Sequence, residues 1–389
     1  MNCRLSLLAL CAALPLPALA QEPYLLDEIV LSAGISPLPV DAYTRAHTIV
    51  TAEQIEARGV TTVQDALRAV PGVSVSSAGS SMTAVRIRGS EANHVLILID
   101  GIEAAGGDDS YVLSGLETAD IDRIEVLRGP QSVIYGSNAS AGVINIITRR
   151  GGEGFTGRGS VEAGHGGAAS LFASQRGAQG GIALSLSARD DRGYDHSGDG
   201  GGRDGINRKT IALSGDIAVT PDLRFGATLR RSDERFGYDA ASWMATDAAG
   251  YIVDADLFAD RDEVQTGVWA EYAMLDGRLT HRLDLQQTIV KQSDEGGPVR
   301  RGETRKLKYR ANLSLDGQPV GQAGQMLSLL AETQRDEHTS APGDRRQMTS
   351  VAAEYRAAFG NLDLQAGIRH DANRTFDDFT SWNLGLGWR

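Results

Sequence analysis

The chain has 389 residues, of which 41% are hydrophobic and 23% are charged, so it is long enough to form more than one ordinary folded domain. Its formal charge of −12 is not offset by any Lys/Arg-rich run. Because an acidic surface repels a phosphate backbone, we expect no nucleic-acid partner.

The first 20 residues have the pattern of a secretory signal peptide. Arg4 precedes the apolar run LSLLALCAALPLP, and small residues lead to a cleavage point after Ala20. The alternative, a short buried helix, is opposed by the two prolines of the run. We expect residues 1–20 to be removed on export together with both cysteines, Cys3 and Cys11, which leaves the mature chain without a disulfide.

Residues 21–50 are expected to be mostly extended or flexible. Within them, DEIVLSA at residues 27–33 is a short β-prone island that precedes the Pro37 and Pro39 pair. On its pattern alone, this island fits an ordinary first strand equally well.

The pattern of helix caps and strands over residues 41–150 predicts one mixed α+β domain. Thr51 and Gln54 are spaced as a capping box at the start of a helix, and Thr62 caps a second helix that ends before a Pro-Gly pair. Strands follow as AVRIRG, as the continuous apolar run HVLILIDG, and as the two halves of IDRIEVLRGPQSVIYGSNASAGVINIITRRG at residues 121–151.

Beyond residue 151 the helical periodicity disappears, and about twelve segments of alternating apolar and polar residues follow. GIALSLSAR, for example, places Ile182 and Leu184 on one face and Ala183 and Ser185 on the other. No segment after the signal peptide holds about 18 consecutive apolar residues, so no helix is expected to cross a membrane.

The links between these segments alternate in length. Short links are expected near Pro221, Gly277 and Gly360, and longer polar ones at 190–208, 233–262, 294–302 and 337–347. Short turns on one rim and long loops on the other favour an up-and-down outer-membrane barrel, with a soluble β-sandwich or β-solenoid as the alternative.

Five motifs in this order resemble a TonB-dependent outer-membrane receptor over residues 27–389: DEIVLSA, VQDALRAVPGVSV, VRIRG, VLILIDG and the stretch at 121–151. The resemblance implies a TonB box in a flexible N-terminal segment (21–40), a plug domain (41–150) and the N-terminal part of an antiparallel transmembrane β-barrel (155–389). It also implies a location in the outer membrane of a Gram-negative bacterium, with membrane lipid as a partner.

Within this family, the barrel sequence and the loops most resemble the cobalamin receptors. The implied function is therefore active import of a scarce nutrient, with cobalamin as the best candidate. A ferric siderophore or haem is the alternative, because receptors for those ligands share the same plug motifs.

The resemblance assigns the strip at 27–33 to TonB binding, because a β-prone strip can add itself as a strand to the edge of a partner's sheet. The residues of this strip are Asp27, Glu28, Ile29, Val30, Leu31, Ser32 and Ala33. The chain has no Gly-x-x-x-x-Gly-Lys-Ser/Thr phosphate loop, so the force for uptake is expected to come from TonB and its inner-membrane energising complex.

The resemblance also marks a set of plug motif residues: Arg88, Gly89, Asp100, Gly101, Arg128, Gly129, Pro130, Tyr135 and Gly136. In the family, the arginines that match Arg88 and Arg128 pair with barrel carboxylates and latch the plug inside the lumen. The alternative is that these arginines are solvated or paired with neighbours such as Glu125.

The Asp-rich stretch DDRGYDHSGDGGGRDG is a candidate for structural calcium in an extracellular loop, since calcium takes several carboxylate oxygens. Resemblance to the cobalamin receptors selects Asp195, Asp199, Asp204 and Asp239 as ligands. A flexible solvated loop is the alternative, because the spacing fits no EF-hand. No other cofactor is expected. The sequence has neither Gly-x-Ser-x-Gly nor His-Glu-x-x-His, so we expect no enzyme.

The number of strands departs from the family, whose transporters close with about 22 strands around a plugged lumen. We expect incompleteness, as a fragment or a truncated gene without transport activity of its own, or else a smaller barrel with its plug outside. A different class of protein, a secreted β-rich carbohydrate-binding or hydrolytic protein, remains a further alternative.

Overall fold

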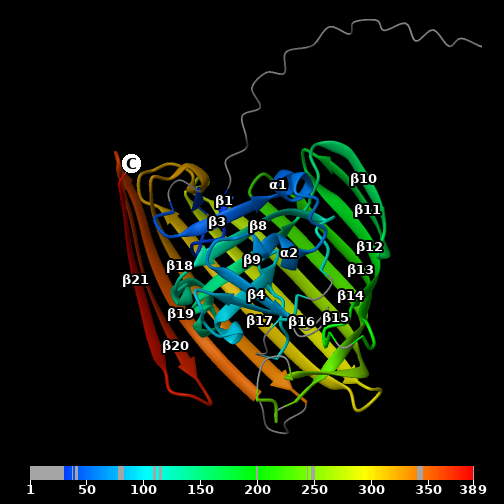
Figure 1. Ribbon diagram of the computed structural model, residues 1–389. Helices are drawn as coiled ribbons and strands as arrows, with labels where there is room; N and C mark the ends of the chain where they lie inside the picture. The colour runs from blue at the N-terminus through cyan, green and yellow to red at the C-terminus, as the bar shows by residue number, and fades with distance from the viewer. Residues whose placement is uncertain are drawn as a thin grey trace, which may run out of the picture.

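The structure, a computed structural model, describes residues 30–36, 38–39, 43–77, 83–107, 111–113, 116–198, 200–242, 244–246, 250–339 and 345–388. A small mixed domain lies against a long antiparallel sheet that curves around it (Figure 1). We call the small domain, residues 43–148, the plug, and the long sheet the wall. The predicted signal peptide, residues 1–20, lies outside the described residues.

The plug is built on a five-stranded sheet with the order β3-β8-β9-β6-β7. These strands are β3 (His47–Thr51), β8 (Ile121–Arg128), β9 (Gly142–Thr148), β6 (Val95–Ile99) and β7 (Ile102–Glu103). The hairpin of β4 (Val73–Ser77) and β5 (Thr83–Ile87) forms a separate two-stranded sheet, as do β1 (Val30–Leu31) and β2 (Leu38–Pro39). The helices are α1 (Ala52–Ala57), α2 (Val63–Arg68) and α3 (Ser132–Tyr135), with 3₁₀ turns at Ala92–His94 and Ser137–Ala139.

The predicted helix caps of the plug are confirmed. The Thr51 hydroxyl accepts a hydrogen bond from the backbone N of Gln54 at 3.4 Å, and the Gln54 side chain accepts one from the backbone N of Thr51 at 3.3 Å. Thr62 caps α2, because its hydroxyl accepts a hydrogen bond from the backbone N of Asp65 at 3.4 Å. The apolar face of α2 then packs into the core, where Leu67 is fully buried.

The continuous apolar run of β6 is buried along its whole length, as expected for a strand covered on both faces. It pairs in parallel with β9, with Leu96 opposite Val143 and Leu98 opposite Asn145. Its two faces contribute to two core clusters, because Ile97 packs with Leu67 in one and Leu98 packs in the other. This sheet therefore packs against the core of the plug on both faces.

The wall contains twelve strands in sequence order, each antiparallel to the next, with β10 and β21 at its edges. Their bounds are β10 (Gly154–Ala163), β11 (Gly166–Gly177), β12 (Gly180–Tyr194), β13 (Asp204–Ala218), β14 (Leu223–Ala241), β15 (Ile252–Met274), β16 (Leu279–Asp294), β17 (Arg300–Ser314), β18 (Gln325–His338), β19 (Arg345–Phe359), β20 (Leu362–Asn373) and β21 (Phe379–Trp388). A further 3₁₀ turn spans Val320–Gln322. The predicted number of strands is confirmed, and the plug lies on the concave side of an open sheet rather than outside a small closed barrel (Figure 1).

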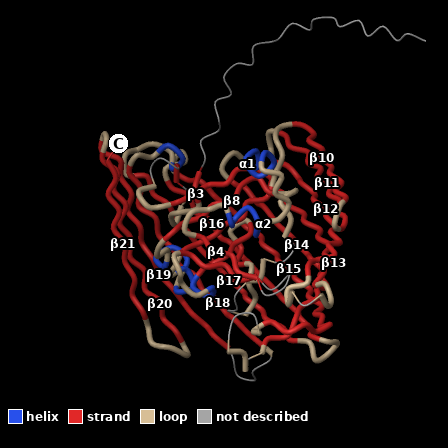
Figure 2. The backbone as a smooth tube through the Cα atoms, in the orientation of Figure 1, coloured by secondary structure: helices blue, strands red, loops and turns tan. Residues whose placement is uncertain are grey.

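The connections of the wall fall on two rims, which Figure 2 shows as loops and turns at the ends of nearly continuous strands. The loop side carries residues 195–198, 200–203 and 250–251, and the turn side carries residues 275–278 and 360–361. The predicted turns near Gly277 and Gly360 are confirmed, since both glycines have positive φ. The loop predicted at 233–262 is wrong for most of its length, because β14 and β15 continue through it as charged, paired strands.

The faces of the wall follow the predicted alternation. Ile182 is 56% exposed on the outer face, whereas Ala183 is 5% exposed on the inner face. The inner face is polar and charged nearer the plug, and Arg369 there is fully buried. None of the helices in the described residues is both long and apolar enough to span a lipid bilayer.

Candidate functional site

The segment Ser32–Ser36, which directly follows the first strand, lies between the plug and the wall. On the plug side, the backbone N of Ser32 donates to Glu125 Oε2 at 3.0 Å, and Asn145 Nδ2 donates to Ser32 Oγ at 2.9 Å. The hydroxyl of Tyr135 donates to the backbone oxygen of Ser32. Both Glu125 and Asn145 are almost completely buried, so this segment supplies partners to polar groups of the plug core.

Tyr135 is held as a hydrogen-bond donor by its surroundings. Burial raises the pKa of the Tyr135 hydroxyl, and the nearby charge of Glu125 raises it further. The hydroxyl therefore keeps its proton at physiological pH and continues to bind the backbone of Ser32.

On the wall side, the same segment is bound by three inward-facing side chains. Glu354 Oε2 accepts a hydrogen bond from the backbone N of Ile35 at 3.4 Å, and Arg310 donates to the backbone oxygen of Ile35 at 3.3 Å. Gln365 Nε2 lies 3.5 Å from the backbone oxygen of Ala33. Ala33 and Ile35 are buried, and their backbone is bound by side chains of the wall.

The predicted TonB box is only partly described. Asp27, Glu28 and Ile29 lie outside the described residues. Val30 and Leu31 form β1 and pair with β2, next to the bound Ser32. The role of the strip in TonB binding stays a prediction.

Among the described residues, three buried ion pairs cross from the plug to the wall, besides an exposed pair of Glu56 with Arg158 at 3.1 Å, and the plug supplies the carboxylate each time. Glu103 Oε2 lies 3.4 Å from Lys306 Nζ, and the backbone oxygen of Glu103 accepts a hydrogen bond from Thr288 at 2.6 Å. The other two pairs join Asp120 to Arg230 at 3.1 Å and Glu117 to Arg189 at 3.2 Å. All these groups are largely buried, so each ion pair is shielded from solvent.

A fourth contact involves a plug tyrosine and a charged cluster on the wall. The hydroxyl of Tyr111 donates to Glu263 at 3.2 Å, and Arg208 bonds both Glu263 at 3.0 Å and Glu234 at 2.5 Å. Burial raises the pKa of Tyr111, and the charge of Glu263 adds to that effect, so the hydroxyl stays protonated.

These plug carboxylates are not among the site residues predicted from the sequence. The available signal was the alternation of the wall, which places charged side chains such as Arg189, Arg230 and Lys306 on the face opposite its apolar residues. An inner face lined by cations requires anions on the plug, but nothing local in the sequence distinguishes Glu103 from a solvated carboxylate.

The two predicted latch arginines lie elsewhere. Arg128 donates to the backbone oxygens of Pro71 at 2.9 Å and His47 at 2.8 Å and to the Thr48 hydroxyl at 3.1 Å, all within the plug. Arg88 is exposed at a turn with positive φ. Within the part of the chain that the structure describes, neither arginine forms an ion pair with a wall carboxylate, and the latch stays a prediction.

Most of the other plug motif residues build turns. Asp100 and Gly101 both have positive φ between β6 and β7, the conformation of a tight hairpin turn, and the Asp100 carboxylate accepts bonds from the backbone N and the hydroxyl of Thr148 at 2.9 and 2.7 Å. Positive φ also occurs at Gly89, Gly129 and Gly136. The backbone oxygen of Pro130 accepts a hydrogen bond from Arg45 at 3.0 Å.

The predicted calcium ligands are in different local settings. The carboxylate of Asp195 already accepts bonds from Ser197, Gly198 and Gly200, and Asp199 lies outside the described residues. Asp204 and Asp239 each keep one buried carboxylate oxygen without a hydrogen-bond partner. No group of three metal-binding side chains is close enough to hold an ion among the residues described, so calcium binding stays a prediction.

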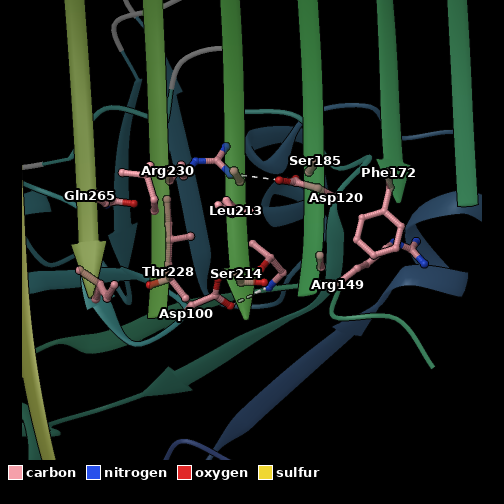
Figure 3. A pocket seen from close by; sticks show the side chains of 16 residues that line it. Asp100, Asp120, Arg149, Phe172, Ser185, Leu213, Ser214, Thr228, Arg230 and Gln265 are labelled. Atoms are coloured by element: carbon pink, nitrogen blue, oxygen red, sulfur yellow. Dashed lines mark hydrogen bonds and ion pairs between the residues drawn. The ribbon is translucent and has the colours of Figure 1, made fainter. Parts of the chain in front are cut away.

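A cavity of about 30 Å³ lies between the plug and strands β11–β15 (Figure 3). Asp100 and Asp120 line it from the plug, Arg149 from the segment that follows β9, and Phe172 and Arg230 from the wall. Such a volume holds one or two water molecules and no nutrient-sized ligand. On this side the plug therefore closes the space beside the wall.

Comparisons with known proteins agree on the family of both parts. Residues 39–143 match the TonB-dependent Receptor Plug Domain family, and residues 150–389 match the TonB dependent receptor-like, beta-barrel family. The vitamin B12 transporter BtuB of Vibrio vulnificus (strain CMCP6) is 25% identical over 95% of this chain and 62% of its own length.

Solved structures of siderophore receptors share the fold. PirA from Acinetobacter baumannii superposes with a TM-score of 0.68 at 20% identity, over 88% of this chain and 59% of PirA. The ferric enterobactin receptor PfeA from Pseudomonas aeruginosa, crystallised as a mutant with enterobactin, superposes with a TM-score of 0.65 at 19% identity, over 88% of this chain and 60% of PfeA. The chain thus spans about 60% of the length of these relatives. Together, the two family matches and the plug bound inside a strand wall show that the chain belongs to the TonB-dependent outer-membrane receptors.

Proposed function

We propose that the chain is the receptor of a TonB-dependent uptake system, exported to the outer membrane of a Gram-negative bacterium, and that its ligand is cobalamin. Its barrel and loops resemble those of the cobalamin receptors, and the chain is 25% identical to BtuB over 95% of its length. Both observations support cobalamin as the ligand. A ferric siderophore is the second candidate, because siderophore receptors have the same fold. The family transports rather than catalyses, so we propose no enzymatic activity.

The observation that carries this proposal is the double attachment of Ser32–Ser36. TonB would add a strand to the strip that ends at Ala33 and pull on it. Because Ser32 is bonded to Glu125 of the plug and Ile35 to Glu354 of the wall, the pull acts first on the junction between the two parts. A hydrogen bond to a charged group is worth about 1.5–3 kcal/mol, so a few such bonds hold the junction closed at rest and yield under force.

On the side of the plug that faces strands β11–β15, passage of a ligand would require the plug to rearrange. The cavity beside Asp120 and Arg230 has a volume of about 30 Å³, far too small for a corrinoid or a siderophore. Transport would therefore break plug–wall contacts rather than use an existing channel.

Equilibrium dialysis of the full chain in detergent micelles against cyanocobalamin, a ferric catecholate siderophore and haem tests the ligand. We expect saturable binding of cyanocobalamin and weaker binding of the other two. Tighter binding of the siderophore would move the assignment to the second candidate. Absence of all binding by a folded chain would support a receptor fragment without transport activity, and full solubility without detergent would support the secreted β-rich alternative.

Coupling is tested separately with Val30→Pro, which removes a backbone donor from the strip. Energy-dependent uptake should be lost while ligand binding is retained. Leu31→Ala, which keeps every backbone donor, is the matched control and should transport normally. Normal uptake by the proline variant would contradict the TonB assignment.

A further inference from the structure

Two arginines stand directly opposite each other on the outer face of the wall. Arg305 of β17 is the cross-strand partner of Arg335 of β18, and the row continues to Gln287 on one side and Gln347 on the other. The side chains of Arg305 and Arg335 are 59% and 44% exposed. Like charges in this arrangement destabilise a sheet unless their charge is compensated.

Nearby carboxylates compensate this charge only in part. Glu303 bonds Arg305 and also Arg301 at 2.6 Å. Glu337 bonds Arg335 and also Arg345 at 3.3 Å. Within the described residues, four arginines therefore share two carboxylates, which leaves an excess of positive charge among these side chains in a chain whose net charge is −12.

The arginine row marks the border between two zones of the outer face. Toward the turn side, the next row contains Leu285 and Leu307, which are 49% and 40% exposed, and the apolar character continues to Leu313. Six residues of strand from Leu307 to Leu313 cover about 20 Å, close to the height of an apolar membrane band. Toward the loop side, the outer face becomes charged with Glu303 and Glu337.

A shallow groove of about 670 Å³ crosses this border over strands β15–β19. It is lined by Val268, Leu285, Leu307, Arg305, Arg335 and Gln347. The groove thus presents apolar side chains at one end and two arginines at the other, and both ends lie on the same open surface.

We propose that this groove binds a phosphate-bearing lipid, with the phosphate between Arg305 and Arg335 and the acyl chains across Leu285 and Leu307. Arginine suits this role because its planar guanidinium forms paired hydrogen bonds with phosphate oxygens. The phosphate also relieves the repulsion within the arginine pair. The arginines lie at the loop end of the groove and the leucines at its turn end. This order matches a lipid in the leaflet on the loop side, because the headgroup of such a lipid lies toward the loops and its acyl chains lie toward the turns.

The inference rests on the proposed placement in the outer membrane, but not on the transported ligand. Native mass spectrometry of the full chain in dodecyl maltoside micelles, titrated with dioleoyl phosphatidate, measures the site. Dioleoyl phosphatidylcholine has the same chains without a net negative charge, and it should bind far less.

The test variant is Arg305→Gln with Arg335→Gln. Its matched control is Arg231→Gln with Arg235→Gln, which removes the same charge from the outer face at β14, where Arg235 bonds Asp260 at 2.7 Å rather than facing another arginine. Affinity for phosphatidate should fall at least about tenfold in the test variant and stay unchanged in the control. The Arg305→Lys, Arg335→Lys variant keeps the charge and should retain part of the affinity, which separates lost binding from lost folding.

Three results would overturn the proposal. The first is equal phosphatidate binding by the test variant and its control. The second is displacement of the lipid by inorganic phosphate at the same concentration, which would mean a simple anion site. The third is a dimer of the chain in the absence of lipid that disappears in the test variant, which would make a second copy the occupant. Affinity for cyanocobalamin or a siderophore should not change in the test variant, so failure of the ligand assignment remains distinguishable from failure of the lipid site.

Discussion

The Glu354 carboxylate accepts a hydrogen bond from the backbone N of Ile35 at 3.4 Å, joining residues that are 319 positions apart in the sequence. Glu354 is almost fully buried on the inner face of the wall and also accepts from Gln365 at 3.2 Å. The acceptor is therefore shared by the N-terminal segment and the wall, and its loss should free both donors.

Glu354→Leu should loosen the segment Ser32–Ser36 without unfolding the plug. A lost hydrogen bond to a charged group costs about 1.5–3 kcal/mol, so amide exchange at Ile35 should become roughly ten- to a hundredfold faster. Hydrogen–deuterium exchange with mass spectrometry measures this rate. Glu271→Leu, at a partly exposed position of the wall paired with Arg282, is the control and should leave exchange at Ile35 unchanged.

The pair of Glu103 and Lys306 should show strong coupling in a double-mutant cycle. Removal of one partner from a buried ion pair leaves the other charge without compensation and costs about 3–5 kcal/mol, so Glu103→Leu and Lys306→Met should each lower the unfolding midpoint in detergent. The loss of stability in the double variant should be much smaller than the sum of the losses in the two single variants. Additive losses of stability would show that the pair does not hold the plug. The control is Arg231→Met on the exposed outer face, which should change the unfolding midpoint little.

Glu117 should make stability depend on pH. Burial raises the pKa of this carboxyl above its ordinary value of 4.5, and Arg189 opposes the shift only in part. The folded state then binds the Glu117 proton more tightly than the unfolded state does, so this contribution is fully present at low pH and is lost as the pH rises through the folded pKa. Comparison of unfolding midpoints at about pH 4 and about pH 7 in the native chain and in Glu117→Gln isolates this contribution, which the variant should lack. The same pH dependence in both proteins would contradict the assignment.

Calcium should act through Asp204 and Asp239 rather than through Asp195. Each of the first two keeps a buried oxygen without a partner, whereas the oxygens of Asp195 already bind its own loop. Asp204→Asn and Asp239→Asn, together with Asp199→Ala, should reduce the gain in ligand affinity that calcium produces, and Asp195→Asn should reduce it less. Binding assays with calcium and with a chelator measure this gain. Equal affinity under both conditions in the native chain would rule the site out.

The local features of the plug could be predicted from the sequence because they depend on neighbouring residues. The capping box of Thr51 and Gln54 forms within one turn of helix, and the Asp-Gly pair at Asp100 needs only its own backbone conformation. The alternation at Ile182 and Ala183 is equally local, since successive side chains of a strand point to opposite faces.

Prediction failed where polar composition was taken to indicate a loop. The residues around Arg235 and Asp260 are charged, but they are opposite each other on β14 and β15 and form a bonded pair. Their partners make them strand, and the partner of a strand residue is not visible from its neighbours in sequence.

The sequence alone determined the family, the two-part architecture and the number of wall strands, because each depends on motif order and on the period of a strand. Only the tertiary structure decided which charges join the plug to the wall. Glu103 meets Lys306 across 203 residues, and Ser32 meets Glu125 across 93. Arg128, which the motif suggested as a latch, bonds the plug backbone. The physical reason is that a buried charge is stabilised by whichever partner the fold brings within a few ångströms, and that distance is set by how twelve strands curve around the plug.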